Sequence, residues 1–157
     1  IVGPGVKILQ VVKADAYGHG AIEISNVALK NGAAMLGVAN ADEGVQLRVS
    51  GITAPILILS PSIVSEIDEI VKYRLIPSVS DLGFAKELER RFRKAGVRRP
   101  VHVEVDTGMG RGGTLYEGAL PMIREIASLP HLELEGIFTH LSSSEHLLGS
   151  EERRERV

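Results

Sequence analysis

The chain has 157 residues, which is enough for one globular unit with a sizeable hydrophobic core. Its 18 basic and 20 acidic residues give a net charge of −2, with no basic patch for nucleic acid. It contains no cysteine, which excludes disulfides, thiolate metal sites and a cysteine nucleophile. No apolar run approaches the roughly 20 residues of a membrane-spanning helix, so we expect no membrane partner. The absence of cysteine is compatible with the cytoplasmic location that we expect.

Short apolar segments alternate with longer amphipathic segments along the chain. The apolar segments predict strands at residues 8–13, 35–39, 56–59, 75–79, 101–105 and 134–139. The amphipathic segments predict helices at residues 21–30, 41–49, 62–73, 81–94 and 115–128. Asn40 is expected to cap the second helix at its start, and Asn31-Gly32 to end the first.

Helices between short apolar strands predict right-handed crossovers and a parallel sheet, so the fold class is α/β. An open doubly wound sheet and a barrel both fit this order. The first predicted strand ends in KADAYGHG and lacks the GxGxxG turn of dinucleotide folds, which favours a (β/α)8 TIM-type barrel. Six strands cannot close such a barrel. The chain begins at Ile1 without an initiator methionine and stops at Val157 in a charged run, so we expect residues 1–157 to be a segment of a longer protein in which two further βα units follow Val157.

The first candidate functional residue is Lys13, at the end of the first predicted strand. Side chains alternate along a strand, so Lys13 shares a face with Leu9 and Val11, and these apolar neighbours predict that the face is buried. Burying an unpaired ammonium is costly, which favours a neutral, nucleophilic amine that can form a Schiff base with an aldehyde. The alternative is an ordinary strand-end lysine whose ammonium lies in water.

The fifth predicted strand alternates between apolar and polar residues. Three valines fall on one face, and the other face carries His102, Glu104 and Asp106. In a barrel these polar side chains would line the lumen, where they must be hydrogen-bonded or functional. The glycine-rich loop that follows carries Arg111, a candidate anion-binding group, with Glu104 or Asp106 as its orienting partner. The alternative is a half-exposed edge strand with a solvated loop.

His140 follows the sixth predicted strand, in the segment FTHLSSS. It could stack on a planar ligand or relay a proton, although a lone histidine at a strand end is often structural. The same alternatives apply to His19, His102, His131 and His146. No pair of histidines has a zinc spacing such as HExxH, so no metal site is predicted. The serines lack a GxSxG elbow and are expected to form a loop.

Three motifs in this chain resemble signatures of the alanine racemase family. VVKADAYGHG (residues 11–20) is similar to the family's pyridoxal-phosphate attachment motif, which is highly specific. DTGMGR (residues 106–111) resembles the second signature and GIFTHL (residues 136–141) the third, in family order and at family-like separations. The resemblance extends along essentially the whole chain. It implies a pyridoxal-phosphate-binding barrel whose remaining units, with a C-terminal β-domain, lie outside this segment.

The resemblance also implies roles for individual residues. Lys13 matches the lysine that forms the Schiff base with the cofactor and acts as one of two catalytic bases. Tyr17 matches a tyrosine that hydrogen-bonds the cofactor phosphate, and His140 a histidine packed beside the cofactor ring. Arg111 matches an arginine near the phenolic oxygen of the cofactor and the substrate carboxylate. The second base, a tyrosine of the other subunit, and the partner of the pyridine nitrogen would lie beyond this segment.

Glu104 departs from the family pattern. Many members have a lysine at this position, and carbamylation turns that lysine into an anion that orients the arginine. Glu104 supplies a carboxylate directly, so we hypothesise that it replaces the carbamate and supports Arg111.

The resemblance implies that the full-length protein interconverts L- and D-alanine for peptidoglycan precursors, as a homodimer with shared active sites. A serine or broad-specificity racemase is a close alternative. A non-catalytic pyridoxal-phosphate carrier is another, although such proteins usually lack the AYGHG and DTGMGR sequences found here. A barrel enzyme unrelated to pyridoxal phosphate is the third. The segment alone is expected to be inactive, because it would lack the opposing base.

Overall fold

The computed structural model describes residues 3–142 and contains one sheet in which every described strand pairing is parallel. Its strands are β1 (Leu9–Val11), β2 (Met35–Val38), β3 (Ile56–Pro61), β4 (Ile76–Val79), β5 (Arg99–Asp106), β6 (Thr114–Leu115) and β7 (Leu132–Phe138). The first five lie side by side in chain order, β7 pairs with β5, and the two-residue β6 pairs with the end of β5.

This strand order distinguishes the two architectures that the sequence left open. In a doubly wound sheet the order of the strands reverses at a switch point, whereas in a barrel each strand lies beside the previous one. Strands β1 to β5 follow one another without reversal, and β7 continues on the far side of β5. The prediction of an incomplete TIM-type barrel is therefore confirmed, with all six predicted strands present and β6 as an addition.

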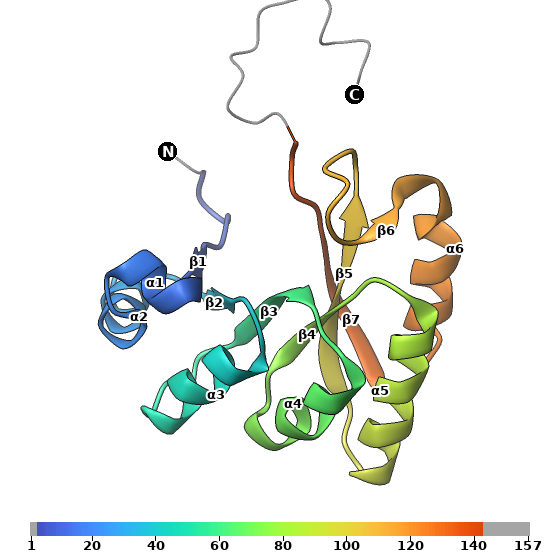
Figure 1. Ribbon diagram of the computed structural model, residues 1–157, viewed down its shortest axis with the longest axis horizontal. Coiled ribbons are helices and arrows are strands. Elements are labelled where there is room, and N and C mark those ends of the chain that lie inside the picture. The colour runs from blue at the N-terminus through green and yellow to red at the C-terminus, as the bar shows by residue number, and fades with distance from the viewer. Residues whose placement is uncertain (1–2, 143–157) are drawn as a thin grey trace, which may run out of the picture.

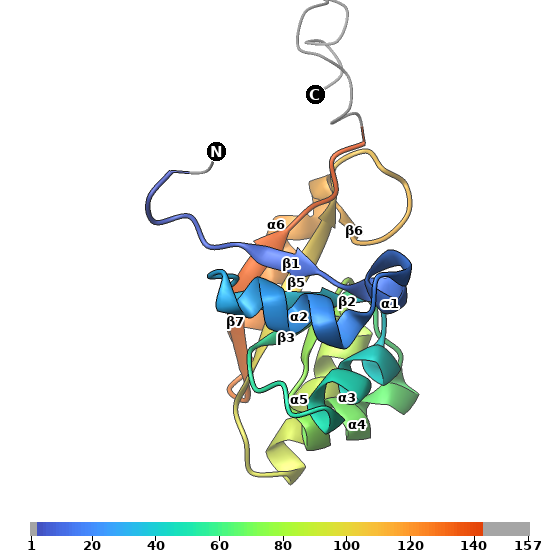
Figure 2. The ribbon, with the colours of Figure 1, turned by 90° about the vertical axis from the view of Figure 1, so that its left-hand side faces the viewer.

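The helices cover one face of the curved sheet, on its convex side (Figure 1, Figure 2). They are α2 (Ala21–Lys30), α3 (Ala41–Val49), α4 (Ile67–Tyr73), α5 (Leu82–Lys94) and α6 (Tyr116–Ala127), with a short 3-10 turn, η1 (Val64–Glu66), before α4. The predicted cap of α3 is confirmed, because the backbone N–H of Glu43 donates to Oδ1 of Asn40 at 3.0 Å. None of the helices in the described part of the chain has the length and apolar character needed to cross a bilayer.

The hydrophobic core lies between the sheet and these helices. Its fully buried members include Leu36, Ile58 and Val103 from the strands and Leu47 and Phe92 from the helices. Two of the three valines of β5 contribute as predicted, since Val101 and Val103 are completely buried, whereas Val105 is only partly buried. Burying side chains of this size stabilises the fold by about 1.5–3 kcal/mol each, so this layer fixes the position of the strands.

The first strand differs from the prediction in length and in its buried face. The predicted strand at residues 8–13 is only Leu9–Val11, because the chain enters a turn, α1 (Lys13–Gly18), directly afterwards. Leu9, Val11 and Lys13 are only partly buried, whereas Val12 is 1% exposed. The prediction that the Lys13 face is buried is therefore wrong. Helices cover the opposite face, toward which Val12 points.

At the amino-terminal edge of the sheet, where the strands begin, one arginine binds the backbone before two strands. Arg48, in the last turn of α3, donates hydrogen bonds to the carbonyls of Ile52 (2.8 Å) and Ala54 (2.7 Å), just before β3. It also donates to the carbonyls of Tyr73 (2.9 Å) and Arg74 (3.2 Å), just before β4. The planar guanidinium therefore holds the entry to two neighbouring strands in one arrangement.

Candidate functional site

The candidate residues gather at the carboxyl-terminal edge of the sheet. In a parallel sheet all strands end at the same edge, where the loops of barrel enzymes carry functional groups. Lys13 and Tyr17 lie in the turn after β1, Glu104 lies near the end of β5, Arg111 follows β5, and His140 follows β7. The sequence prediction that these groups lie at strand ends is therefore confirmed by the fold.

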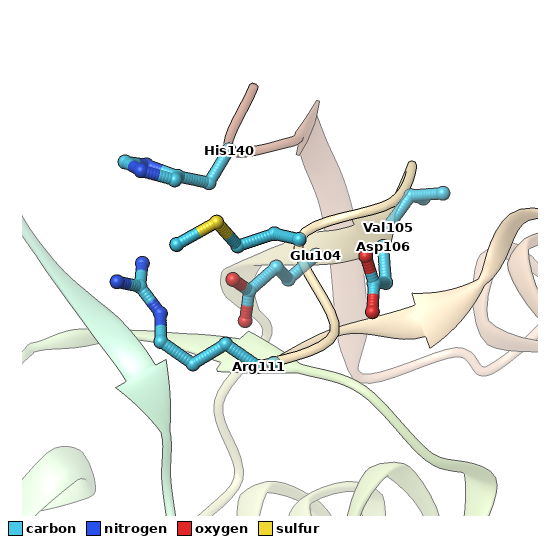
Figure 3. Close-up of a pocket in the computed structure, with 7 residues that line it drawn as sticks. Glu104, Val105, Asp106, Arg111 and His140 are labelled. Carbon is cyan, nitrogen blue, oxygen red and sulfur yellow. The ribbon is translucent and has the colours of Figure 1, made fainter. Parts of the chain in front are cut away.

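Three of the candidates line one pocket (Figure 3). Glu104 and Arg111 point toward the same space, and His140 lies on its other side. The full lining is Glu104, Val105, Asp106, Met109, Arg111, Gly112 and His140. A carboxylate, a guanidinium and an imidazole thus converge from two strands, β5 and β7, that are paired neighbours. This arrangement can bind an anionic group and hold the arginine that binds it.

Glu104 is the buried member of this pocket. Its residue exposure is 5%, and its Oε2 atom accepts no hydrogen bond from any described residue. Burial raises the pKa of the Glu104 carboxyl above its ordinary value, although the positive charge of Arg111 opposes that shift. The negative charge of Asp106 raises the pKa further, and His140 lowers it. Because Glu104 and Arg111 line the same pocket, this oxygen can accept a hydrogen bond from the guanidinium or from a bound molecule.

Asp106 has a different role from Glu104. Its Oδ1 accepts a hydrogen bond from the N–H of Gly108 at 2.9 Å, and its Oδ2 accepts one from the N–H of Gly110 at 2.9 Å. These backbone donors lower the pKa of the Asp106 carboxyl below its ordinary value. Asp106 therefore folds the loop that carries Arg111. Of the two orienting partners that the sequence left open, Glu104 is the one whose carboxylate remains available to Arg111.

Lys13 and Tyr17 lie outside that pocket. They belong to the turn after β1, the edge strand, whereas the pocket is built on β5 and β7. Lys13 is partly buried, and Tyr17 is 63% exposed. The described residues thus bring together Glu104, Arg111 and His140 but not the first motif. In a closed barrel the two edges of the sheet approach each other, which would bring both groups to one mouth.

The turn that carries Lys13 has an unusual backbone. Residues 14–17 all have left-handed dihedral angles, with φ between 51° and 56°, although none of them is glycine. For residues with a Cβ atom this conformation costs roughly 1–2 kcal/mol each, so surrounding contacts must hold it. Asp15, to which the sequence gave no role, supplies one contact, because its Oδ1 accepts a hydrogen bond from the N–H of Ala21 at 2.7 Å.

Sequence reasoning missed a second residue that holds this turn. Glu43 accepts hydrogen bonds from the N–H of Ala14 at 2.9 Å and from the N–H of Ala39 at 2.8 Å. One signal was present, since Asn40 followed by Glu43 has the spacing of a capping box. In that motif the glutamate turns back to its own helix start. Here one oxygen binds Ala39, just before the helix start, and the other reaches across to Ala14 in the turn after β1, which the spacing does not indicate.

The other described histidines have structural partners. His102 contacts Glu135 on β7 at 3.1 Å, and His131 contacts Glu89 on α5 at 2.7 Å. His19 contacts the carbonyl of Ala16 at 2.9 Å and so closes the turn after β1. These contacts favour the structural interpretation for all three. His146 lies outside the described residues.

Comparison with known proteins decides which family combines these features. The family model for the N-terminal domain of alanine racemase matches residues 1–156. The chain belongs to the alanine racemase family. An alanine racemase from Halothermothrix orenii is 41% identical over 145 residues, which are 92% of this chain and 38% of that protein. The resemblance that the three motifs implied is therefore confirmed.

Solved structures of amino-acid racemases share this fold. An alanine racemase from Clostridium difficile 630 superposes with a TM-score of 0.91 at 34% identity, over 99% of this chain and 42% of that chain. A histidine racemase from Leuconostoc mesenteroides subsp. sake superposes with a TM-score of 0.80 at 26% identity, over 87% of this chain and 37% of that chain. The chain thus spans about two fifths of the length of these relatives, in their barrel portion.

Proposed function

We propose that the full-length protein is a pyridoxal-phosphate-dependent amino-acid racemase that interconverts L- and D-alanine for peptidoglycan precursors. One observation carries the proposal: the amine of Lys13 and the pocket of Glu104, Arg111 and His140 follow strands of one parallel sheet, at the same edge. Membership of the alanine racemase family and the relatives named alanine racemase support the choice of reaction.

The side chains at this edge fit pyridoxal phosphate. The cofactor has an aldehyde, a phosphate, a phenolic oxygen and a flat ring, and the chain offers an amine, a phenol, a guanidinium and an imidazole. We assign the amine of Lys13 to the aldehyde, Tyr17 to the phosphate, Arg111 to the phenolic oxygen and His140 to the ring. Arg111 lines the same pocket as the carboxylate of Glu104 and the imidazole of His140, which supports a ligand-binding arginine.

When bound, the cofactor supplies an aldehyde that holds the substrate amine and a ring that withdraws electrons from the substrate Cα. Lys13 then acts as a base that removes or returns the proton at Cα on one side. Arg111 binds the substrate carboxylate and thereby fixes which bond of Cα faces Lys13. The base for the opposite side is assigned to a segment outside this chain, contributed by the other subunit of a homodimer.

Glu104 is proposed to orient Arg111 without carbamylation. Its carboxylate is buried in the same pocket, and Asp106, the other nearby carboxylate, is bound to the loop backbone. A permanent carboxylate needs no added carbon dioxide to hold the guanidinium. A crystal structure of the full-length protein in which Glu104 points away from Arg111 would contradict this role.

A racemase for a different amino acid is the second candidate. The histidine racemase from Leuconostoc mesenteroides shares the fold of this chain, so the barrel portion alone is compatible with more than one substrate. Comparing alanine, serine and histidine as substrates of the full-length protein distinguishes the candidates. Because peptidoglycan precursors are made inside the cell, we also propose a cytoplasmic location.

The test uses the full-length protein loaded with pyridoxal phosphate. Racemisation of L-alanine, followed by chiral chromatography, is expected to fall by about 10²- to 10⁴-fold or more in Lys13→Ala, the range for loss of a general base. Lys7→Ala, which removes an exposed lysine before β1, serves as the control and should keep its rate. Turnover in Lys13→Ala close to that of the unaltered protein would disprove the proposal.

A further inference from the structure

The side chain of Glu43 links the ends of two neighbouring strands. Its Oε1 accepts a hydrogen bond from Ala14, the first residue after Lys13, at 2.9 Å. Its Oε2 accepts a hydrogen bond from Ala39, the first residue after β2, at 2.8 Å. Strands β1 and β2 are paired in parallel, with Val11 opposite Gly37, so one carboxylate spans the carboxyl-terminal end of this pair. Both of its oxygens therefore face backbone donors.

Glu43 is itself held firmly. It lies in the first turn of α3, where its own N–H donates to Oδ1 of Asn40 at 3.0 Å. The next residue, Gly44, is buried, and a Cβ added there would come within 2.9 Å of the Leu75 side chain. The backbone of α3 is thus packed tightly at this point, so the Cα atom from which the Glu43 carboxylate extends is held in place.

The turn after Lys13 requires such an anchor. Four consecutive residues with Cβ atoms, Ala14 to Tyr17, have left-handed backbone angles. Without contacts to the rest of the fold, these residues would return to ordinary backbone regions and rotate the peptide next to Lys13. Asp15 holds the far end of the turn through Ala21, and Glu43 holds the near end through Ala14. Of these two anchors, Glu43 binds the residue adjacent to the lysine.

We infer that Glu43 is a positioning residue: by fixing the peptide between Lys13 and Ala14, it aims the lysine amine at the aldehyde of the cofactor. This inference rests on the proposed function, because it assumes that Lys13 bonds covalently to pyridoxal phosphate. Both carboxylate oxygens of Glu43 bind backbone N–H groups, and Glu43 does not line the pocket of Glu104, Arg111 and His140, so it is assigned no direct contact with cofactor or substrate. It acts through the left-handed turn, so its loss affects the covalent step more than the binding of the cofactor's phosphate and ring.

The test compares Glu43→Gln with Asp42→Asn in the full-length protein. Each substitution removes one negative charge from the first turn of α3, but Asp42 is exposed and its side chain makes no hydrogen bond with the described residues. Glutamine has the same length as glutamate and keeps only one acceptor oxygen, so its amide group must face one of the two N–H donors. A backbone donor is then left unpaired.

Two ligands separate covalent attachment from simple binding. Pyridoxal phosphate is mixed with the cofactor-free protein, and its bond to Lys13 is followed by visible absorbance and by borohydride trapping with peptide mass analysis. Pyridoxine phosphate, which lacks the aldehyde, measures non-covalent affinity alone. In Glu43→Gln we expect covalent attachment to slow by about tenfold, while the Kd for pyridoxine phosphate changes by less than about threefold. Asp42→Asn should match the unaltered protein in both.

The outcomes distinguish this inference from the proposed function. If the unaltered protein forms no bond between Lys13 and pyridoxal phosphate, the proposed function fails. If it does, and Glu43→Gln attaches the cofactor as fast as Asp42→Asn, only the inference about Glu43 is overturned. Equal losses for both ligands in Glu43→Gln would also overturn it, because they would indicate a general structural role.

A measurement on the unaltered protein covers the case in which Glu43→Gln does not fold. The amide hydrogens of Ala14 and Ala39 should exchange with solvent at least about tenfold more slowly than in an unstructured peptide of the same sequence. Ala14 is exposed, so its protection would come from the hydrogen bond to Glu43 rather than from burial. Exchange of Ala14 at the peptide rate would contradict the inference.

Discussion

The turn after β1 and the loop after β5 both hold a candidate functional side chain at the carboxyl-terminal edge of the sheet, but different kinds of residue form their backbones. Each follows a parallel strand and presents a nitrogen-bearing side chain, Lys13 or Arg111, at the carboxyl-terminal edge of the sheet. In the loop after β5, the left-handed positions are glycines, with φ of 126° at Gly108, 67° at Gly110 and 97° at Gly113. In the turn after β1, four residues with Cβ atoms adopt left-handed angles instead.

The two segments also differ in which residues hold their backbones in place. The loop after β5 contains residues that adopt its backbone angles readily, and a carboxylate of the same strand end, Asp106, closes it. The turn after β1 is disfavoured locally and depends on a carboxylate from a different element, Glu43 in α3. The arginine loop is therefore held by contacts within its own segment, whereas the lysine turn combines the local contacts of Asp15 and His19 with a contact to Glu43, a distant residue.

The largest effect is expected for Gly113→Ala in the loop after β5. A Cβ at this position would lie 2.8 Å from the backbone nitrogen of Asp106 and 3.0 Å from the carbonyl oxygen of Glu104. Both neighbours are backbone atoms, and the φ of 97° adds strain. We expect the free energy of unfolding to fall by roughly 3 kcal/mol or more in urea denaturation.

Gly118→Ala is the matched control for that substitution. Gly118 lies in α6, and a Cβ there would meet no atom within 4 Å. Alanine in a helix interior should raise the stability by up to about 1 kcal/mol. Equal effects of the two substitutions would show that the loop does not depend on glycine at residue 113.

Asp106→Asn tests whether a charged carboxylate closes the loop. Backbone donors lower the pKa of Asp106 in the folded state below the ordinary value of 3.8, so its charge stabilises the fold above that pH. The stabilisation is lost as the pH falls from 3.8 through the lower folded-state pKa. Asp106→Asn should therefore be less stable than the unaltered protein at pH 7, and the difference should shrink below pH 3.8. A difference that is constant between pH 7 and pH 2, measured by thermal unfolding, would exclude this mechanism.

The smallest effect is expected for Ala14→Gly in the turn after β1. Glycine relieves the left-handed strain at residue 14 but adds freedom to the unfolded chain, and the two contributions are similar, so stability should change by less than about 0.5 kcal/mol. Ala28→Gly in the right-handed helix α2 is the control and should cost about 1 kcal/mol. If Ala14→Gly costs as much as Ala28→Gly, the turn is not strained in the way described.

The contrast between local and distant contacts also explains which features of the structure can be predicted from the sequence. The strands, most of the helices, the cap at Asn40 and the burial of Val101 and Val103 follow from local patterns, and the structure confirms them. The helix predicted at residues 62–73 is the exception, because α4 begins only at Ile67, after η1. The polar face of β5 and its glycine loop predict that Glu104 and Arg111 lie together, and both residues line one pocket. These features depend on residues that are close together in the chain.

The features that the sequence did not predict depend on distant residues. No glycine marks residues 14–17 as left-handed. One hydrogen bond that holds this turn comes from Glu43, 29 positions along the chain from Ala14, and no local pattern reveals it. The choice between Glu104 and Asp106 as the partner of Arg111 required the fold of the loop backbone. Burial at β1 was assigned to the wrong face, since alternation alone does not say which face the helices cover. Strand β6 has two residues, too few for any periodicity.

Arg48 has a consequence for how such a fold can change. One rigid guanidinium holds carbonyls from the segments entering β3 and β4 at fixed directions, so neither entry loop can lengthen without losing its donor. New residues are accommodated far more easily at the opposite rim, in the loops that leave the strands. Loops at the carboxyl-terminal edge of the sheet can therefore change and alter the chemistry, while the contacts of Arg48 at the amino-terminal edge preserve the fold.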